Sequence, residues 1–335
     1  MITKLRLKNW KSFKDSTVYI DPLTILIGVN ASGKSNVLDA LDFIHKLLTS
    51  KTDKTSEFLA TIRGGKNWLI RRGEKMCELE ITVANDNLEV IYTFWSDGET
   101  VSMSFQSTDG KASGETKDKC FKELQSIFVF NPVPEKMRGY SPVSSELKPD
   151  GSNIAGVIAS LPKDEKEKLE AELTRYVSPL PEKDIRKIQS VTVGLNNSDA
   201  MLYCYEEWNP DKPIDARGMS DGTLRFAAIV LALLTAKPHS LLVIEEIDNG
   251  LHPSRAKELV KVMKELSQKR SVDILCTTHN PVLINELGNE MIPFISYVKR
   301  DSEGNSVIEL LEEKDNLAKL MASSTIGGIM TEDKL

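Results

Sequence analysis

The segment Gly28–Ser35 reads Gly-Val-Asn-Ala-Ser-Gly-Lys-Ser, which fits the pattern of a glycine, four residues and then Gly-Lys-Ser. Glycines let the backbone curl so that successive N–H groups point inward at phosphate oxygens, and a following helix adds the positive end of its dipole. Lys34 would contact the β- and γ-phosphates, and Ser35 would hold Mg²⁺. The segment predicts a site for ATP and Mg²⁺ rather than a glycine turn with an exposed lysine. The predicted nucleotide-binding residues are Gly28, Asn30, Ala31, Ser32, Gly33, Lys34, Ser35 and Asn36.

Two adjacent carboxylates, Glu245 and Glu246, follow the apolar run Leu241–Ile244. A buried strand that ends in two carboxylates can deliver one to a metal ion and the other to an attacking water. Because side chains alternate along a strand, the two cannot point the same way, and we expect their roles to differ. We assign Glu245 to Mg²⁺ and Glu246 to polarising the water. The alternative is a solvated turn at the end of a strand.

A histidine, His279, stands after a second apolar run, Val272–Cys276, which continues into Thr277 and Thr278. A lone histidine is usually structural. Its place at the expected carboxyl edge of the same sheet favours contact with the γ-phosphate.

A glycine-flanked segment, Gly218–Thr223, precedes a long apolar helix. Ser220 or Asp221 could simply cap that helix. A helix start of this kind is also a phosphate site, and a second such start suggests that it serves the nucleotide of another protomer. We therefore add Ser220, Asp221 and Gly222 to the predicted nucleotide-binding residues.

The elements predicted around these residues suit a phosphate-binding loop. Leu23–Ile27 is a short apolar strand that ends at Gly28, and apolar positions from Lys34 to Leu48 follow helical spacing. Strand, glycine loop and helix thus follow one another without a gap. The last third alternates helices and strands, which indicates an α/β sheet. We predict helices at Thr223–Ala236 and Ser254–Ser267, and strands at Leu241–Ile244, Val272–Cys276, Phe294–Lys299 and Val307–Leu311.

The remaining segments predict an antiparallel region and a small helical lobe. We expect an edge hairpin between Ile2 and Ile20, antiparallel strands over Cys77–Phe105 with a turn at Asn85–Asn87, a loop over Ser107–Asp118, strands at Ile127–Phe130, Val191–Leu195 and Leu202–Tyr205, and one amphipathic helix, Asp164–Tyr176, within Gly139–Pro181.

The composition is that of an ordinary soluble globular protein, with 335 residues, 40% hydrophobic and 27% charged. The net charge of -6 argues against a surface that is basic overall. A local basic cluster would have to carry any contact with nucleic acid. No apolar run is long enough to span a membrane, no signal peptide is read, and four scattered cysteines suit a reducing compartment, so we expect a cytoplasmic protein.

In this order the motifs resemble those of the ATP-binding-cassette (ABC) ATPases, and more narrowly the RecF/SMC-like group, which includes AAA-family ATP-binding proteins and OLD-like ATPase heads. The resemblance extends from the first strand to about Ile308. It rests on Leu7–Phe13 (LKNWKSF) before the P-loop, the P-loop or Walker A motif with Asn36–Ala40, Met219–Gly222 at the signature motif, Glu245-Glu246 at the Walker B pair, Asp248–Pro253 at the D-loop, and Thr278–Pro281 at the switch histidine.

The resemblance implies the fold of an ABC-ATPase head: an α/β P-loop core sheet with an antiparallel β subdomain and a small helical lobe. We expect one such domain over residues 1–335. It would comprise a Walker A lobe with antiparallel strands at 1–138, a short helical insertion at 139–190, and a part with the signature, Walker B and switch histidine at 191–335.

The resemblance also implies hydrolysis of ATP to ADP and phosphate, with Glu246, His279 and Lys34 as catalytic residues. It implies a head-to-head homodimer in which each nucleotide lies between one P-loop and the Ser220–Gly222 segment of the other copy. Stand-alone heads of this group commonly act in bacterial anti-phage defence beside a separately encoded nuclease or toxin.

Three features depart from the group's pattern. The first Walker B carboxylate is Glu245 instead of the commoner aspartate. The glutamine expected at the lobe junction is not obvious, with Asn131 a plausible replacement and Gln125 a weaker one. The region Gly139–Gln189 is too short for a coiled coil, and the roughly 25 residues after Leu310 are too few for a nuclease domain.

Other functions remain open at this point. A repair-type ATPase would bind DNA directly, and the basic cluster Arg63, Lys66, Arg71, Arg72 and Lys75 would carry that contact if it is more than a solvated loop. The motor of a transporter is disfavoured by the opening motif and by Glu245. A scaffold that does not hydrolyse ATP is possible because catalysis needs a second subunit.

Overall fold

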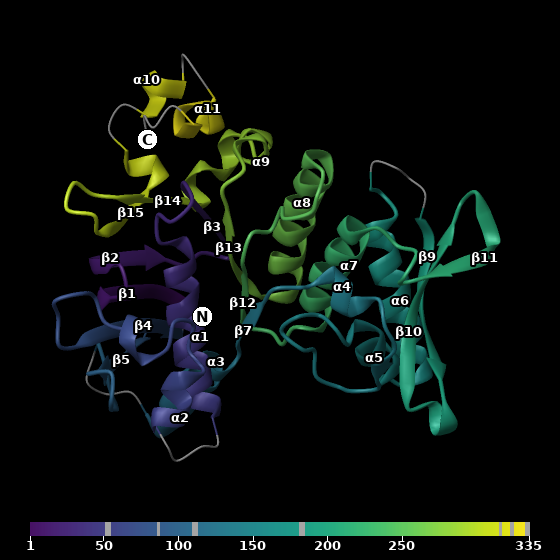
Figure 1. The fold of residues 1–335 in the computed structure, drawn as a ribbon, viewed down its shortest axis with the longest axis horizontal. Coiled ribbons are helices and arrows are strands. Elements are labelled where there is room, and N and C mark those ends of the chain that lie inside the picture. The colour runs from purple at the N-terminus through teal and green to yellow at the C-terminus, as the bar shows by residue number, and fades with distance from the viewer. Residues whose placement is uncertain are drawn as a thin grey trace. The chain divides into compact units, whose positions relative to one another are not determined.

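The computed structural model describes residues 1–50, 55–85, 88–108, 113–180, 185–314, 317–321 and 325–331 (Figure 1). The chain forms two compact units. The first comprises Met1–Val129, Lys237–Ile247 and Ser271–Leu335, and the second comprises Phe130–Ala236 and Asp248–Arg270. Neither unit is continuous in the sequence, so each requires segments that are far apart along the chain.

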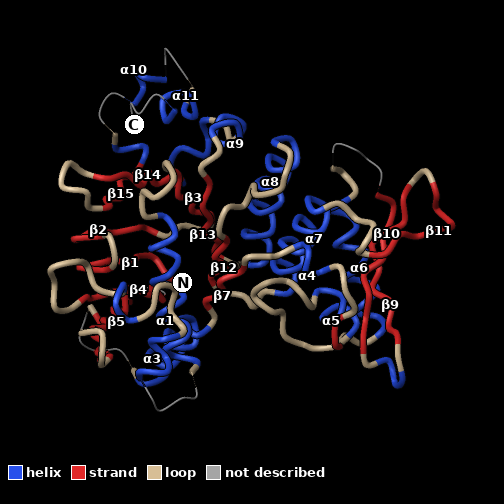
Figure 2. Tube along the Cα trace, viewed as in Figure 1, coloured by secondary structure: helices blue, strands red, loops and turns tan. Residues whose placement is uncertain are grey.

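An 11-stranded sheet dominates the first unit, in the order β6-β5-β4-β1-β2-β15-β14-β3-β13-β12-β7 (Figure 2). The side from β6 to β2 is antiparallel, as predicted for Cys77–Phe105, and its turn at 86–87 lies outside the described residues. The strands are β1 (Ile2–Trp10), β2 (Phe13–Tyr19), β3 (Leu23–Ile27), β4 (Cys77–Asn85), β5 (Leu88–Ser96), β6 (Val101–Ser107), β7 (Ile127–Phe130), β12 (Leu241–Ile244), β13 (Asp273–Thr278), β14 (Ile295–Arg300) and β15 (Ser306–Leu310).

The parallel part of this sheet is centred on β3, in which every residue is buried. Strands β13 and β14 run parallel to β3 on its two sides, and β12 pairs in parallel with β13. The carboxyl ends of parallel strands lie at one edge of a sheet, so the loops after β3, β12 and β13 meet there. The predicted strands Leu23–Ile27 and Leu241–Ile244 are confirmed, and the predicted strand from Val272 runs on to Thr278 as β13.

Helix α1 (Lys34–Thr49) follows the P-loop, close to its predicted bounds. Its apolar side chains at helical spacing are buried, and Phe43 meets the rings of Trp10 and Phe58, each with a centroid distance of 5.4 Å. The other helices of this unit are α2 (Thr55–Ala60), α3 (Gly114–Gln125), α9 (Pro281–Glu286), α10 (Leu317–Met321) and α11 (Ile326–Thr331), with single 3₁₀ turns at η1 (Lys66–Trp68), η3 (Asn289–Phe294) and η4 (Leu311–Glu313).

The opening hairpin of β1 and β2 is not at the edge of the sheet, which corrects the prediction. Strand β1 pairs with β4, and β2 lies beside β15. The reason is long-range: the C-terminal strands β14 and β15 return to the sheet next to the hairpin, and no local pattern records that return. The edge at this side is formed by β6 instead.

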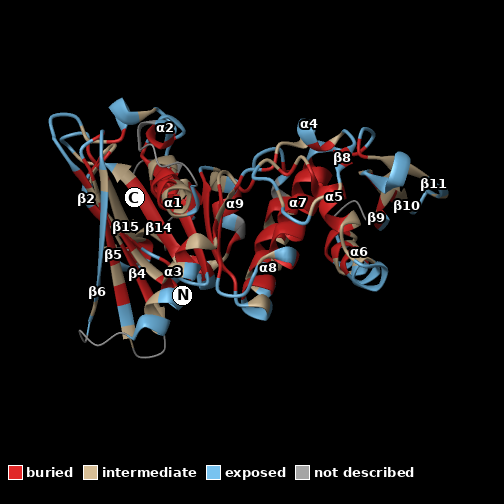
Figure 3. Ribbon diagram, turned by 90° about the horizontal axis from the view of Figure 1, so that it is seen from below, coloured by how far each residue is buried: buried red, intermediate tan, exposed pale blue. Residues whose placement is uncertain are grey.

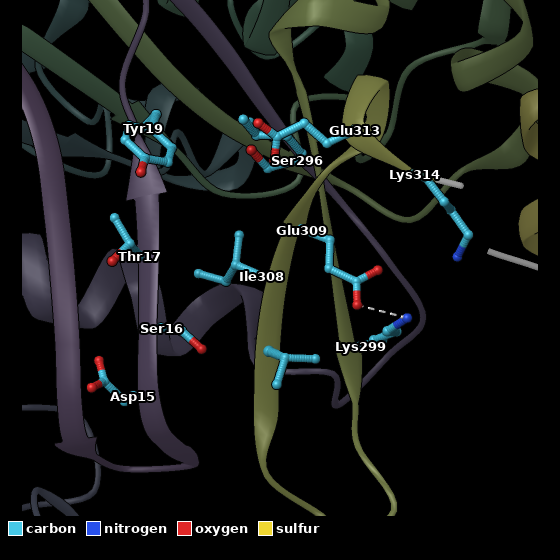
Figure 4. Close-up of a pocket in the computed structure, with 12 residues that line it drawn as sticks. Asp15, Ser16, Thr17, Tyr19, Ser296, Lys299, Ile308, Glu309, Glu313 and Lys314 are labelled. Atoms are coloured by element: carbon cyan, nitrogen blue, oxygen red, sulfur yellow. Dashed lines mark ion pairs between the residues drawn. The ribbon is translucent and has the colours of Figure 1, made fainter. Parts of the chain in front are cut away.

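A pocket of about 700 Å³ opens between β2 and β15, because these neighbours pair only at Ser306 and Phe13 (Figure 4). Lys299 and Glu309 form an ion pair at its wall, with 2.8 Å between Nζ and Oε1. None of the predicted nucleotide-binding residues lines this pocket.

The second unit packs helices against a small antiparallel sheet. Helix α7 (Asp221–Thr235) is buried from Gly222 to Leu234, which explains why its sequence is apolar on every side (Figure 3). Strand β10 pairs with β8, β9 and β11. The other elements are α4 (Pro134–Met137), α5 (Ile154–Ala159), α6 (Lys163–Val177), α8 (Pro253–Arg270), β8 (Ser141–Pro142), β9 (Ile185–Val193), β10 (Asp199–Glu206), β11 (Asn209–Asp215) and the 3₁₀ turn η2 (Leu195–Asn197).

Several predicted boundaries differ from the structure. The expected loop Ser107–Asp118 contains the start of α3, where Ser113 caps the helix by accepting the N–H of Thr116. The strand expected at Val191–Leu195 begins at Ile185 and ends at Val193. Strand β11 has two prolines, so β propensity alone did not indicate it, and it forms through its pairing with β10.

Candidate nucleotide-binding site

The P-loop connects the end of β3 to the start of α1. Gly28 has φ +150° and Gly33 has φ +121°, conformations that other residues rarely adopt. A Cβ on Gly28 would lie 2.2 Å from the carbonyl oxygen of Val298, and one on Gly33 would lie 2.3 Å from Ser306 Oγ. Both backbone geometry and space therefore require glycine at these positions.

Lys34 is almost fully buried within the loop. Its Nζ donates to the carbonyl oxygens of Gly28, at 2.7 Å, and Val29, at 2.8 Å. Burial lowers the pKa of Lys34, while attraction to Glu246 and Glu245 acts in the opposite direction. The loop thus holds an ammonium group whose present acceptors a phosphate could replace.

Ser32 and the first turn of α1 offer donors to an anion. The buried Ser32 Oγ has no hydrogen-bond partner among the described residues, and buried hydroxyls are rarely left in that state. No side chain caps the first turn of α1 within the described structure, and the N–H of Asn36 donates to the carbonyl oxygen of Gly33, which leaves the N–H groups of Lys34 and Ser35 for an anion. An uncapped helix start with an unpaired hydroxyl fits a phosphate group.

A chain of hydrogen bonds fixes the P-loop from β15 and the opening hairpin. Ser306 Oγ donates to the carbonyl oxygen of Ser32, at 2.5 Å. Asn36 Nδ2 donates to Ser12 Oγ at 2.7 Å, so the Ser12 hydroxyl is left to donate to Ser306 Oγ, also at 2.7 Å. Trp10 Nε1 donates to the carbonyl oxygen of Asn36, at 2.8 Å.

Ser306 and Arg300 were not predicted from the sequence. Arg300 donates from Nε and Nη2 to the carbonyl oxygen of Ala31, at 3.1 and 3.0 Å. Both residues reach the loop from 274 or 269 positions away, and no motif surrounds them. Ser12 and Trp10 did carry a signal, because both lie within Leu7–Phe13.

The Walker B carboxylates, Glu245 and Glu246, lie after the end of β12 and not on the strand itself. Strand β12 ends at Ile244, and Glu246 has φ +48°, a left-handed conformation that is rare outside glycine. The N–H of Glu246 donates to Thr277 Oγ1 at 2.9 Å. The expected strand alternation therefore does not set the directions of the two side chains, because both residues lie beyond the end of the strand.

The two carboxylates nevertheless have different partners. Glu245 Oε1 lies 3.3 Å from Arg63 Nη1. Glu246 Oε1 lies 3.5 Å from Nδ1 of His279, which follows β13 directly. Both members of this second pair are 42% exposed, so a water has access to the space beside them. The structure thus brings Lys34, Glu245, Glu246 and His279 to one edge of the sheet.

A basic pocket of about 740 Å³ lies beside the P-loop in the same unit. Arg71 donates to Asn305 Oδ1 from Nε, at 2.9 Å, and from Nη2, at 2.6 Å, and the Arg72 guanidinium lies 5.1 Å from the centre of the Trp68 ring. Its cationic lining comprises Lys11, Arg63, Arg71, Arg72 and Arg300.

The basic cluster predicted from the sequence is thereby divided. Arg63, Arg71 and Arg72 line the pocket, whereas Lys66 instead pairs with Glu99 at 3.2 Å. Arg63 also approaches Asp39, and Lys11 Nζ lies 2.6 Å from the Asp39 carboxylate. Burial raises the pKa of Asp39, and the bond from Lys11 lowers it.

The signature segment belongs to the second unit, at the start of α7. Ser220 is the N-cap, and its Oγ accepts the N–H of Thr223, so the capping alternative describes its geometry. Ser220 and Asp221 are exposed, and Gly222 is buried. Their predicted role toward a nucleotide of a second copy stays a prediction.

The candidates for the lobe-junction residue have different surroundings. Gln125 donates to the carbonyl oxygen of Leu48, at the C-terminal end of α1. The P-loop is at the other end of this helix, about 21 Å from Leu48 at a rise of 1.5 Å per residue. Gln125 is therefore too distant, and Asn131, which follows β7, remains the candidate.

Ser35 and the carboxylates suit Mg²⁺. The described residues contain no group of three or more acidic, histidine or cysteine side chains that could hold a metal on its own. Mg²⁺ in nucleotide sites is usually held by few protein oxygens together with phosphates and water. Ser35 stands in the first turn of α1, half-buried, and fits such a partial donor set with Glu245.

Comparisons with known proteins agree with this geometry. Residues 1–135 match the family described as "AAA ATPase domain", and residues 135–285 match "AAA domain, putative AbiEii toxin, Type IV TA system". The DNA replication and repair protein RecF of Corynebacterium jeikeium is 27% identical over 90 residues, which are 27% of this chain and 19% of that protein. An ATP/GTP phosphatase of Helicobacter pylori is 23% identical over 333 residues, and the match covers 86% of this chain and 87% of that protein.

A solved structure shows the fold. The Smc head domain bound to the C-terminal domain of ScpA, from Pyrococcus furiosus, has a TM-score of 0.60 and 16% sequence identity, with 100% of this chain and 99% of that chain covered. The chain therefore has the fold of an SMC-type ABC-ATPase head, as expected. This chain covers 19% or less of the length of several curated relatives that it matches. Together the comparisons support an ATPase of the RecF and SMC type, and ATP hydrolysis at that coarse level.

Proposed function

We propose that this protein binds ATP and Mg²⁺ and hydrolyses ATP in a dimer that shares its nucleotides between two copies. The observation that carries the proposal is the meeting of Lys34, Glu246 and His279 beside a P-loop whose Ser32 hydroxyl has no partner. The comparisons support the ATPase class, and the geometry supports the residue roles proposed below.

The residues of the chain divide the reaction between them. Lys34 exchanges its loop carbonyls for β- and γ-phosphate oxygens, and the N–H groups at the start of α1 bind the same phosphates. Ser35 and Glu245 would hold Mg²⁺, which supplies charge neutralisation at the phosphates when bound. Glu246 orients the attacking water and accepts its proton, and His279 donates to the γ-phosphate.

The Arg63–Glu245 ion pair sets a condition on this cycle. A carboxylate engaged with a guanidinium at 3.3 Å has to release it before it can act toward a metal ion. Arg63 is 56% exposed, so it can turn toward a phosphate of the incoming nucleotide. The pair would therefore open when ATP and Mg²⁺ bind together.

The basic pocket beside the P-loop would take the nucleoside end of ATP. It borders Ser12 and Asn36, which support the loop, and it contains Trp68, an aromatic ring that is 54% exposed. A base can stack on such a ring, and arginine planes can stack on the base.

A shared site explains why the Ser220–Gly222 segment belongs to another unit than the P-loop. The second copy would present this segment to the γ-phosphate, so nucleotide binding and dimerisation would be coupled. The dimer would act on a partner protein. We propose that this partner is an effector of the toxin or nuclease kind and that the two act in anti-phage defence; residues 135–285 match a family whose description includes a putative AbiEii toxin.

The test is the Glu246→Gln variant, compared with Lys34→Ala. We expect Glu246→Gln to bind ATP, to form a stable dimer with it, and to release phosphate at least about 100-fold more slowly than the wild type. Lys34→Ala should lose ATP binding itself. Normal hydrolysis by Glu246→Gln would refute its role, and Glu246→Gln that binds ATP as a monomer would refute the shared site.

Direct DNA binding is a second candidate, favoured by the five cations around one pocket. Reversal of charge at Arg71 and Arg72 should then abolish a DNA affinity that falls with salt. Charge reversal at Lys66 and Lys75, outside that pocket, is the matched control. Absence of DNA binding by the wild type would leave effector control as the function.

A further inference from the structure

One arginine of the second unit, Arg138, holds the segment that leads into the signature helix. Its Nη1 donates to three backbone carbonyl oxygens, those of Ala216 at 3.1 Å, Arg217 at 2.9 Å and Met219 at 2.8 Å. Its Nη2 donates to Asp221 Oδ1 at 2.5 Å. A single guanidinium therefore fixes the loop before α7 and the first residue of that helix.

Arginine is suited to this position because its N–H donors form a rigid planar fork. A lysine ammonium has one nitrogen on a flexible stem and cannot replace donation from both Nη1 to the carbonyls and Nη2 to Asp221. The Arg138 side chain is 29% exposed, so it is neither a free surface cation nor an inaccessible core group. Its hydrogen bonds go to the backbone and to Asp221, a residue predicted from the sequence to bind nucleotide.

A second arginine holds the same segment from α8. Arg255 Nη1 lies 3.0 Å from Thr223 Oγ1 and 3.4 Å from Ser220 Oγ. The same Nη1 would lie 3.1 Å from a Cβ at Gly222. The segment is thus held by two guanidinium groups, with Arg138 on Asp221 and Arg255 near Ser220 and Gly222, so its position is set before any nucleotide arrives.

We infer that Arg138 is a positioning residue for the Ser220–Gly222 segment, and that it acts on the nucleotide bound by the other copy. The inference rests on the proposed shared site. Arg138 belongs to the second unit and the P-loop to the first. Loss of Arg138 should consequently spare ATP binding by its own P-loop and impair the closed dimer.

The first experiment separates these two steps with Arg138→Ala. We expect its Kd for ATP to equal that of the wild type, and its rate at saturating ATP to fall between about 10-fold and 100-fold, as for a misplaced catalytic group. In the Glu246→Gln background the same change should abolish ATP-dependent dimerisation, which light scattering measures. Arg138→Lys should recover little, because it lacks the fork.

Lys136→Ala is the matched control, since Lys136 lies two positions away on α4, is exposed, and pairs with Asp150. It should retain the wild-type rate. Thermal melting of each variant shows whether it is folded. A folded Arg138→Ala that hydrolyses ATP at the wild-type rate would overturn the inference.

Mixing tests whether Arg138 acts across the dimer. Lys34→Ala should be inactive alone and Arg138→Ala should keep at most about a tenth of the wild-type rate. A mixed dimer joins the intact P-loop of the Arg138→Ala copy to the intact signature segment of the Lys34→Ala copy. An equal mixture should recover roughly a quarter of the wild-type rate, because about half of the dimers are mixed and each has one complete site. Lys34→Ala mixed with Ser220→Arg is the calibration.

The outcomes separate the two proposals. Recovery in both mixtures supports the role of Arg138. Recovery only with Ser220→Arg shows that the site is shared and that Arg138 does not act through it. Failure of both mixtures contradicts the shared site itself, and the role of Arg138 with it.

Discussion

At the scale of single residues, the site depends on backbone positions that side-chain motifs do not describe. Glu246 has a left-handed backbone, and such strain outside glycine persists only where neighbours hold it. Thr277 is one of those neighbours. Its hydroxyl accepts the N–H of Glu246, and its own side chain is 1% exposed.

Thr277→Val should therefore lower the ATPase rate about 10-fold at saturating ATP, with little change in ATP affinity, because valine keeps the shape and removes the acceptor. The unpaired N–H should also lower the free energy of unfolding by about 1–3 kcal/mol. Steady-state kinetics and urea unfolding measure the two effects. Thr277→Ser retains the hydroxyl and should restore the rate, and an unimpaired Thr277→Val would show that the bond does not position Glu246.

At the scale of elements, β15 supports the P-loop that β3 and α1 define. Ser306 donates to the backbone of Ser32 and accepts from Ser12, so the C-terminal strand fixes the curvature of a loop near the N-terminus.

Ser306→Ala should raise the Kd for ATP by about 5-fold to 30-fold, which corresponds to the ~1–2 kcal/mol of lost loop bonds. The fold should persist, since alanine fits the space of serine. Calorimetric titration with a non-hydrolysable ATP analogue measures this change. Ser302→Ala, on the turn before β15, is the control and should bind as the wild type does. Equal affinities for both variants would mean that the loop keeps its shape without β15.

The C-terminal helix α11 gives a second prediction at this scale. Gly327 approaches α9 so closely that a Cβ would lie 2.2 Å from the carbonyl oxygen of Pro281, and its N–H donates to Asn285 Oδ1 at 2.8 Å. Because a backbone oxygen cannot move aside for that Cβ, Gly327→Ala should displace α11 and lower the free energy of unfolding by about 1–3 kcal/mol. A lower Tm is the expected result, and an unchanged Tm would show that α11 does not pack on α9 in solution.

At the scale of the whole molecule, one buried acid makes stability depend on pH. Burial, and then repulsion from Glu123 and Asp21, raise the pKa of Asp273 to about 7, although the Met1 amino group offsets part of the shift. Its Oδ1 has no hydrogen-bond partner among the described residues. The folded protein thus keeps a proton on Asp273 that the unfolded chain, with an ordinary value of 3.8, releases.

The sign follows from linkage. Protonated Asp273 contributes fully to the free energy of unfolding below its unfolded-state pKa of 3.8. This contribution is lost as the pH rises through the folded-state pKa of about 7. Asp273→Asn should remove this loss, so the variant should exceed the wild type in unfolding free energy at pH 8 and not below pH 4. Urea unfolding across that range tests this, with Asp211→Asn, an exposed residue of β11, as the control. A difference that stays constant with pH would contradict the assignment.

At this scale the chain also passes repeatedly between its two units. No helix in the described part of the chain is both long and apolar enough to cross a membrane. Unit boundaries fall at Phe130, Lys237, Asp248 and Ser271, and the one at Asp248 directly follows the Walker B segment. Glu245 and Glu246 therefore lie just before the point where the chain passes from the first unit to the second.

The sequence by itself determined the P-loop, its strand and helix, and the identities of Lys34, Glu245, Glu246 and His279, because these depend on local spacing and on runs of apolar residues. Only the tertiary structure decided what surrounds them. The return of β15 beside the opening hairpin, the bonds from Ser306 and Arg300 to the loop, and the turn at Glu246 all join positions far apart along the chain. Local pattern carries no record of such pairings, since loop closure and packing are set by the whole chain.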